Sequence, residues 1–229
     1  MTLRPPSADS SVVILIPALQ RPHRVAPLLQ SIVDNTPAPH SVLFICDPDD
    51  LEQQRAVPRD VGLLLYKPIH PQGPYASKIN AGVRASIAPL IFLAADDLHF
   101  HPGWLEAARA QLELGAQVVG VNDLIRRRRS RAGHATHFLM TRDYAQLPTV
   151  DGERGPLYEG YHHWHVDDEL IATARKRGVY AYAPDSRVEH LHPVAHKAPD
   201  DATYARGRSD VRRDRRRFAA RRHLLLEGT

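Results

Sequence analysis

"IFLAADDLHF", residues 91–100, is an apolar run that ends abruptly in two adjacent aspartates, Asp96 and Asp97. Continuous apolar sequence of this length predicts a strand that is buried on both faces. Two neighbouring carboxylates repel each other, so the end of this strand requires a compensating positive charge.

Strands and helices are expected to alternate on both sides of this stretch. Apolar runs predict strands at residues 11–18, 40–50, 60–67, 89–97 and 116–123. Apolar residues at helical spacing predict helices at 24–36, 75–87 and 102–115. This alternation is typical of an α/β protein whose central sheet is mostly parallel and has helices on both faces.

Acids and polar residues follow several of these strands. In open α/β sheets, ligands bind beyond the carboxyl ends of the strands. Those ends carry residues 17–21, 47–50 and 96–97. Paired aspartates at such an edge favour a divalent cation shared with phosphate oxygens, and carboxylates suit Mg²⁺ or Mn²⁺. In the alternative reading, Asp97 faces the amino end of the helix that begins near Pro102.

The termini and the second half of the chain are less regular. We expect residues 1–10 to be disordered, because two prolines discourage regular structure. After residue 122, a loop rich in aromatic residues and histidine leads into a helix capped by Asp167 and closed by Gly178, followed at 179–193 by a strand pair or a strand and a loop. Residues 208–227 predict a helix with Val211, Phe218 and Leu225 spaced by sevens.

Length and composition indicate a globular, soluble protein. The chain has 229 residues, 43% of them hydrophobic, and its one cysteine, Cys46, lies in an apolar run. Its apolar runs are too short to span a bilayer, and it has no recognisable signal peptide. We expect a cytoplasmic protein without disulfides, located in the host cytoplasm if the gene is phage-encoded, and the oligomeric state stays open.

Positive charge is concentrated in two arginine-rich segments. Residues 206–223 carry +7 and residues 126–131 carry +5, within a net charge of only +4, so the remainder of the chain carries −8. Such segments suit contact with an anionic partner, although a solvated helix and an exposed loop would also explain them.

Six blocks, in order, resemble the glycosyltransferases of the GT-A fold, in particular glycosyltransferase family 2. The blocks are "VVILIPALQRP", "LFICDPDD", "GPYASKINAGVRAS", "IFLAADDLHFHPGWLE", "HVDDELIATARKRG" and "VEHLHP". The resemblance covers residues 11–195. It implies a GT-A catalytic domain at 11–200, with a nucleotide-sugar half at 11–122 and an acceptor half at 123–200, followed by an arginine-rich helix or tail at 201–229.

The resemblance also implies roles for individual residues. Donor contacts fall to Pro17, Leu19, Arg21, Asp47, Asp50, Lys78, Asn80 and Asp96, with Asp49 competing for the nucleoside and Arg84 as a further basic helper. Asp97 would bind Mn²⁺ or Mg²⁺ together with His190 or His192, of which we favour His192. A strict Asp-x-Asp motif would need an acid at Ala95, so the chain departs from the pattern there.

The acceptor side is expected near the helix that Asp167 caps. An acceptor hydroxyl needs a carboxylate to take its proton, and Asp167, Asp168 and Glu169 are the candidates, with Asp167 favoured. Flat side chains for stacking are Tyr161, His163 and Trp164. The histidine cluster could instead bind zinc or pack within its loop, but its spacing matches no zinc signature.

These features predict a metal-dependent, inverting glycosyltransferase that uses a nucleotide-sugar, with a UDP-sugar favoured. Arg127, Arg128 and the arginine-rich tail would hold a DNA acceptor that carries a hydroxymethylated base. The alternatives are a lipid-linked or polysaccharide acceptor at a membrane surface, a nucleotidyltransferase, and a non-catalytic nucleic-acid-binding protein. A nucleotidyltransferase would be expected to have a glycine-rich loop after the first strand, and "PALQRPHR" has no glycine.

Overall fold

The computed structural model describes residues 2–5, 9–37, 39–68, 74–125 and 133–225. These residues form a nine-stranded sheet in the order β1-β4-β3-β2-β5-β8-β7-β9-β6. The strands are β1 (Thr2–Arg4), β2 (Val12–Pro17), β3 (His40–Cys46), β4 (Gly62–Leu65), β5 (Leu90–Leu93), β6 (Leu98–Phe100), β7 (Val118–Asn122), β8 (Phe138–Thr141) and β9 (Tyr180–His190).

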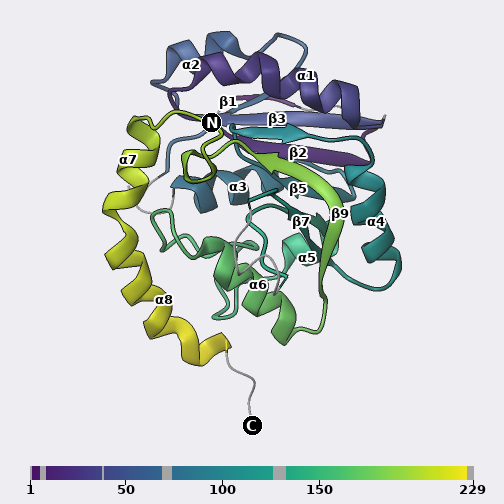
Figure 1. Cartoon of the computed structure of the whole chain (residues 1–229), viewed down its shortest axis with the longest axis vertical. Coiled ribbons are helices and arrows are strands. Elements are labelled where there is room, and N and C mark those ends of the chain that lie inside the picture. Colours follow the sequence, from purple (N-terminus) through teal and green to yellow (C-terminus); the bar gives the residue numbers. More distant parts are fainter. Residues whose placement is uncertain (1, 6–8, 38, 69–73, 126–132, 226–229) are drawn as a thin grey trace.

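Helices lie on both sides of this sheet (Figure 1). They are α1 (Val25–Asn35), α2 (Leu51–Ala56), α3 (Pro74–Ala85), α4 (Trp104–Glu113), α5 (Arg142–Gln146), α6 (Val166–Lys176), α7 (Ala202–Ser209) and α8 (Val211–Leu225). Two short 3₁₀ helices, Pro22–Arg24 and Pro193–Ala195, follow β2 and β9. No helix within the described ranges is both long and apolar enough to cross a bilayer.

The two halves of the sheet differ in strand direction. In the first half, β2 pairs in parallel with β3 and β5, and β3 pairs in parallel with β4, as the alternation of strands and helices predicts. The second half adds antiparallel pairs between β5 and β8, β7 and β8, and β6 and β9, while β9 runs parallel to β7. The carboxyl ends of β2, β3, β5, β7 and β9 therefore share one edge.

The apolar sequence of β2 is explained by burial on both faces. Val13 and Leu15 pack in the core on the side of α3 and α6, and the alternating residues Val12, Ile14 and Ile16 pack on the side of α1 and α4. Successive side chains of a strand point to opposite faces, so a strand covered on both sides must be apolar throughout. The expected burial of Cys46 in β3 is confirmed.

The prediction of a disordered lead is wrong for residues 2–4. They form β1, which pairs antiparallel with β4 at the edge of the sheet. The side chain of Arg4 also donates to the carbonyl oxygen of Pro58 at 2.7 Å. Three residues can complete the open edge of β4 before Pro5 ends the pairing, because proline has no amide N–H to donate.

The expected C-terminal helix is two helices, α7 and α8, which run down one side of the molecule (Figure 1). The predicted seven-residue spacing is confirmed for two of its members. The Phe218 ring stacks on His165 with centroids 4.8 Å apart, and Leu225 is buried. The basic segment is therefore packed onto the body of the protein.

Candidate active site

Asp96 and Asp97 lie at the carboxyl edge of the sheet, just beyond β5. The amide of Ala94 donates to the carbonyl oxygen of Leu15, so the chain leaves β5 still attached to β2. Asp96 is 8% exposed and Asp97 is 4% exposed. Both carboxylates are thus buried, and buried charge requires partners.

Arg21 supplies one such partner. Its Nη1 lies 2.8 Å from Asp96 Oδ1 and 3.7 Å from Asp97 Oδ2. Its Nε and Nη2 donate to the two oxygens of Asp201 at 2.9 Å, and its guanidinium stacks over the Tyr204 ring at 4.2 Å. The guanidinium is fully engaged with the protein, so the structure gives Arg21 the role of joining the acid pair to α7 rather than the predicted role of contacting the donor.

Asp97 is surrounded by hydrogen-bond donors. Tyr204 donates its hydroxyl to Asp97 Oδ2 at 2.7 Å, and His190 Nε2 lies 3.2 Å from the same oxygen. The structure therefore favours His190 over His192 as the partner of Asp97. His192 lies one step away, with its ring against Tyr204 and its Nδ1 accepting from the amide of Val194.

The residues present offer part of a ligand set for a divalent cation, although among the residues that the structure describes no three His, Cys, Asp or Glu side chains gather closely enough to hold one. Within the described part of the chain, Asp97 Oδ1 and His190 Nδ1 are both buried and have no hydrogen-bond partner. A buried carboxylate oxygen left without a donor is costly unless a cation or another group completes it. Carboxylate oxygen and imidazole nitrogen both ligate such metals. Asp97 and His190 are thus two residues that could each contribute a ligand to one.

The local charges affect the two aspartates in opposite ways. Burial and the neighbouring Asp97 raise the pKa of Asp96 to about 6. Burial alone would also raise the pKa of Asp97, but His190 and the Tyr204 hydroxyl outweigh it and hold that pKa well below its ordinary value. Asp97 therefore keeps its charge to a lower pH than Asp96 does.

The ends of β2 and β3 are tied together beside this pair. Lys78, buried in α3, donates to the carbonyl oxygen of Ala18 at 3.0 Å and lies 2.9 Å from Asp47 Oδ1. Pro17 and Leu19 are partly exposed at the same edge. The expected donor-side residues that lie together are thus Pro17, Leu19, Asp47 and Lys78.

Three other expected donor-side residues have different surroundings. Asp50 caps α2 through the amide of Gln53 and also accepts from the amide of Gln20. Asp49 pairs on the surface with Lys67. Arg84 is exposed near the end of α3.

The expected donor contact by Asn80 is wrong. Asn80 is 1% exposed, and its amide donates to the carbonyl oxygen of Leu157 and to Glu159. Gly155, with φ of 98°, packs so closely on Asn80 that a Cβ there would lie 2.7 Å from its side chain. Asn80 therefore anchors the 155–159 loop.

Two of the three candidate bases face a cluster of histidines. Asp167 Oδ2 lies 3.3 Å from His134 Nε2, and Asp168 Oδ2 lies 2.6 Å from His165 Nδ1. Both acids stand in the first turn of α6, where the helix dipole favours negative charge. The side chain of Asp167 is 26% exposed, so it can meet an acceptor.

The assignment of Glu169 as a base is wrong, and so is that of Tyr161 as a stacking surface. Glu169 is 4% exposed, forms a two-point ion pair with Arg221 at 2.9 and 2.7 Å, and accepts from the Tyr161 hydroxyl at 2.6 Å. Tyr161 is completely buried in the core. Helical geometry turns Glu169 inward, away from the face that Asp167 occupies.

The remaining acceptor-side residues are divided between surface and support. His163 is exposed, whereas Trp164 is partly buried and donates its indole N–H to the carbonyl oxygen of Gly207 at 2.6 Å. Trp164 thus holds α7 in place. Arg127 and Arg128 lie outside the described residues.

The two acid sites lie on the same side of the molecule. Helix α7 joins them: its Tyr204 donates to Asp97 at 2.7 Å, and the carbonyl oxygen of its Gly207 accepts from Trp164, three residues before Asp167, at 2.6 Å. Asp97 and the candidate base therefore border the same helix.

Sequence reasoning missed two residues of this region, Asp201 and Tyr204. Asp201 caps α7 by accepting from the amides of Thr203 and Tyr204, and this places the Tyr204 hydroxyl against Asp97. Asp201, which precedes "ATYAR", is a recognisable helix-start signal. The residues that Asp201 and Tyr204 contact, Arg21 and Asp97, both lie more than a hundred residues earlier in the sequence.

Solved structures with the same fold are glycosyltransferases. No protein-family model matches the sequence, and no curated protein does. A mannosyltransferase from Pyrobaculum calidifontis, solved with GDP-Man and Mn²⁺, aligns with a TM-score of 0.63 and 14% identity over 87% of this chain and 61% of its own. This chain thus spans about three fifths of that enzyme's length.

Two further structures agree. Glucosyl-3-phosphoglycerate synthase from Mycobacterium tuberculosis, solved with Mn²⁺, UDP and glucosyl-3-phosphoglycerate, aligns with a TM-score of 0.55 and 15% identity over 89% of this chain and 78% of its own. TarS from S. aureus aligns with a TM-score of 0.57 and 10% identity, over 78% and 59% respectively. The predicted GT-A fold is confirmed.

Proposed function

We propose that this protein is a metal-dependent glycosyltransferase that moves a sugar from a nucleotide-sugar to an acceptor hydroxyl. The observation that carries the proposal is the buried pair Asp96-Asp97 beyond β5, with His190 3.2 Å from Asp97 and with α7 joining Asp97 to the start of α6. The structural neighbours solved with Mn²⁺ and UDP or GDP-Man support the same chemistry.

The donor half would hold the nucleotide diphosphate at the strand edge. Asp97 Oδ1 and His190 would ligate Mn²⁺ or Mg²⁺. A metal held there would supply positive charge to stabilise the leaving diphosphate without any proton transfer. Asp47, beside Lys78, is positioned to meet the nucleoside. We favour a UDP-sugar as the donor.

Asp167 would act as the base. Its Oδ2 accepts the proton of the acceptor hydroxyl, and His134 Nε2, 3.3 Å away, orients the carboxylate. Asp168 is engaged by His165 at 2.6 Å and is less available. A single base opposite the leaving group gives direct displacement, and therefore inversion at the transferred carbon.

For the acceptor we propose a hydroxymethylated base in DNA. The support is the basic surface of α8 combined with the direction of its large apolar residues. Phe218 packs on His165 and Leu225 is buried, so neither is presented for insertion into a membrane surface. The enzyme would then act in the cytoplasm, where both DNA and nucleotide-sugars occur.

The test is a screen for hydrolysis and transfer with UDP- and GDP-sugars in the presence of Mn²⁺, with and without hydroxymethylated DNA. Asp167→Asn should lower transfer by about 10²–10⁴-fold, the usual contribution of a general base, while donor binding stays intact. Asp168→Asn is the matched control. If Asp168→Asn stops transfer and Asp167→Asn does not, the base is the neighbouring residue.

A further inference from the structure

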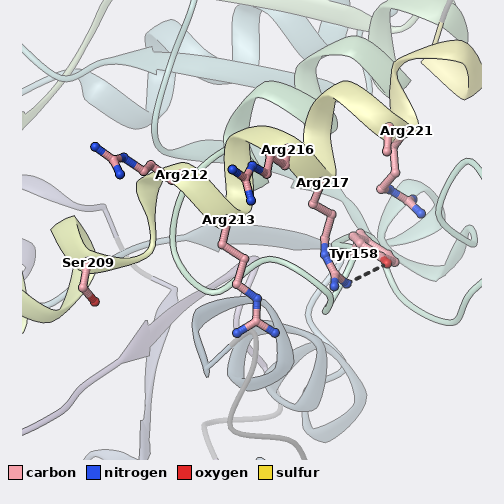
Figure 2. Close-up of a pocket in the computed structure, with 8 residues that line it drawn as sticks. Tyr158, Ser209, Arg212, Arg213, Arg216, Arg217 and Arg221 are labelled. Atoms are coloured by element: carbon pink, nitrogen blue, oxygen red, sulfur yellow. Dashed lines mark hydrogen bonds between the residues drawn. The ribbon is translucent and has the colours of Figure 1, made fainter.

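The outer face of α8 forms an open groove lined by arginines. The groove has a volume of about 650 Å³. Its lining comes from α8, the adjoining end of α7 and the loop before α6 and consists of Tyr158, Ser209, Arg212, Arg213, Arg216, Arg217, Ala220 and Arg221. Figure 2 shows these arginines on successive turns of α8, with Arg217 pointing to the Tyr158 hydroxyl.

Most of this positive charge is not balanced by the protein. Among the described residues, Arg212, Arg213 and Arg216 form no ion pair. Arg212, Arg213 and Arg216 are all exposed. Like charges at i, i+4, such as Arg212 and Arg216, destabilise a helix slightly, so an anion bound across them would relieve this repulsion.

The opposite face of α8 fixes this groove relative to the acid sites. Asp214 is completely buried and accepts from the backbone amides of His162, His163 and Trp164 at 2.8–3.0 Å. Arg221, at one end of the groove, turns its guanidinium inward and binds Glu169 of α6, two residues from Asp167. The arginine groove and the candidate base are therefore held on one rigid unit.

The dimensions of the groove match a chain of phosphates. From Arg212 to Arg221 the helix rises nine residues, roughly 14 Å. One nucleic-acid strand places a phosphate about every 3.4 Å along the helix axis, so about four phosphates lie within this length. Tyr158 adds an aromatic ring at the base of the groove, partly covered by Arg221 at 3.4 Å.

We propose that the α8 groove binds the phosphodiester backbone of a nucleic acid strand through Arg212, Arg213, Arg216 and Arg217. The proposal rests on the function above, because it supplies a docking site for the acceptor. A general attraction between charges would involve every exposed arginine of α8. The proposal assigns the contact to the arginines on one face of the helix.

The experiment compares two double variants of the full chain. Arg212→Gln/Arg216→Gln removes two groove arginines, and Arg215→Gln/Arg222→Gln removes two exposed arginines that do not line the groove. Both lose the same charge from the same helix. Deleting α8 is unsuitable, because Asp214 and Arg221 would be lost with it.

Binding is measured by fluorescence anisotropy with a labelled 20-nucleotide DNA, single-stranded and duplex, over a range of NaCl concentrations. The groove variant should bind on the order of tenfold more weakly at low salt, and its slope of log K against log[salt] should fall by about 1.4–1.8. The control variant should retain most of the wild-type slope. Equal losses in the two variants would overturn the proposal.

Two further measurements separate the possible failures. Vesicles containing phosphatidylserine provide the membrane comparison: a groove variant that loses vesicle binding but keeps DNA binding would also overturn it. Hydrolysis of the donor, which does not require the groove, should be unchanged in both variants. Hydrolysis without DNA binding would refute the groove alone, and DNA binding through the groove without hydrolysis would refute the proposed enzyme activity instead.

Discussion

The strand-end edge and the outer face of α8 treat charge in opposite ways. At the edge, Asp96 and Asp97 are buried, and Arg21, His190 and Tyr204 surround them. On the outer face of α8, Arg212, Arg213 and Arg216 are exposed, and among the described residues they form no ion pair. Buried charge must be matched within the fold, whereas exposed charge can await a ligand.

This difference shows which charges stabilise the fold and which are available to bind a ligand. The inner face of α8 belongs with the strand-end edge, since Asp214 and Arg221 are both buried and paired. A single arginine-rich helix thus carries both kinds of charge. The number of arginines in α8 does not distinguish the buried, paired charges from the exposed ones, whereas substituting individual arginines does.

The largest effect is expected at the edge. Asp97→Asn should lower glycosyl transfer by about a thousandfold or more, because a bound metal contributes several kcal/mol of charge stabilisation. Calorimetry should show that UDP binding loses its dependence on Mn²⁺. The surface variant Asp143→Asn is the control. Unchanged transfer by Asp97→Asn would remove the metal role from this residue.

Breaking the inner face of α8 should destabilise the fold. Arg221→Met leaves Glu169 buried without its cation and should lower the free energy of unfolding by about 3–5 kcal/mol, measured by urea denaturation. Arg222→Met, one residue away and exposed, should change it by about 0.5 kcal/mol or less. Similar losses in the two variants would mean that the inner and outer faces do not differ.

A smaller effect is expected for the hydroxyl that joins α7 to the edge. Tyr204→Phe removes the 2.7 Å hydrogen bond to Asp97 and should cost about 1.5–3 kcal/mol, the range for hydrogen bonds to charged groups. The ring that stacks under Arg21 is retained. Urea denaturation measures the loss, and a stability equal to wild type would show that the bond does not form in solution.

The smallest effect depends on pH. The hydrogen bond from Arg221 lowers the pKa of Asp151 from 3.8 to about 2. An acid whose pKa is lower in the folded state stabilises the fold above its unfolded pKa, and loses that contribution as the pH falls through the folded value. Wild type should therefore exceed Asp151→Asn by about 1–2 kcal/mol at pH 5, and by less near pH 2.

Urea denaturation at several pH values measures this difference. Other groups titrate in the same pH range, but wild type and Asp151→Asn share them, so their contributions cancel in the difference between the two stabilities. A difference that stays constant between pH 5 and pH 2 would contradict the pairing of Asp151 with Arg221.

Much of the first half of the fold could be predicted from local sequence. The apolar run of β2 and the periodicity of α1 and α4 follow directly from burial on one or both faces. The position of Asp96 and Asp97 at the ligand-binding edge follows from their place after β5. Strand direction in the second half did not follow, because antiparallel pairing depends on partners distant in sequence.

The surroundings of the candidate site were harder to predict for the same reason. Glu169 and Asp167 are two residues apart and chemically similar, yet only the first meets Arg221. Tyr161 belongs to an aromatic, histidine-rich loop but points into the core. No local pattern indicates that residues 201–204 return to the end of β5, so Tyr204 becomes recognisable only in three dimensions.

The position of Tyr204 has a consequence for biosynthesis. A ribosome releases the amino-terminal strands first, and domains generally begin to fold from that end. Asp97, which follows β5, can nevertheless form its hydrogen bond with Tyr204 only after about a hundred further residues have been translated. Nascent chains that stall before Asp201 would therefore lack the residues that pair with Arg21 and Asp97, and the candidate site would be assembled only after α7 has been translated.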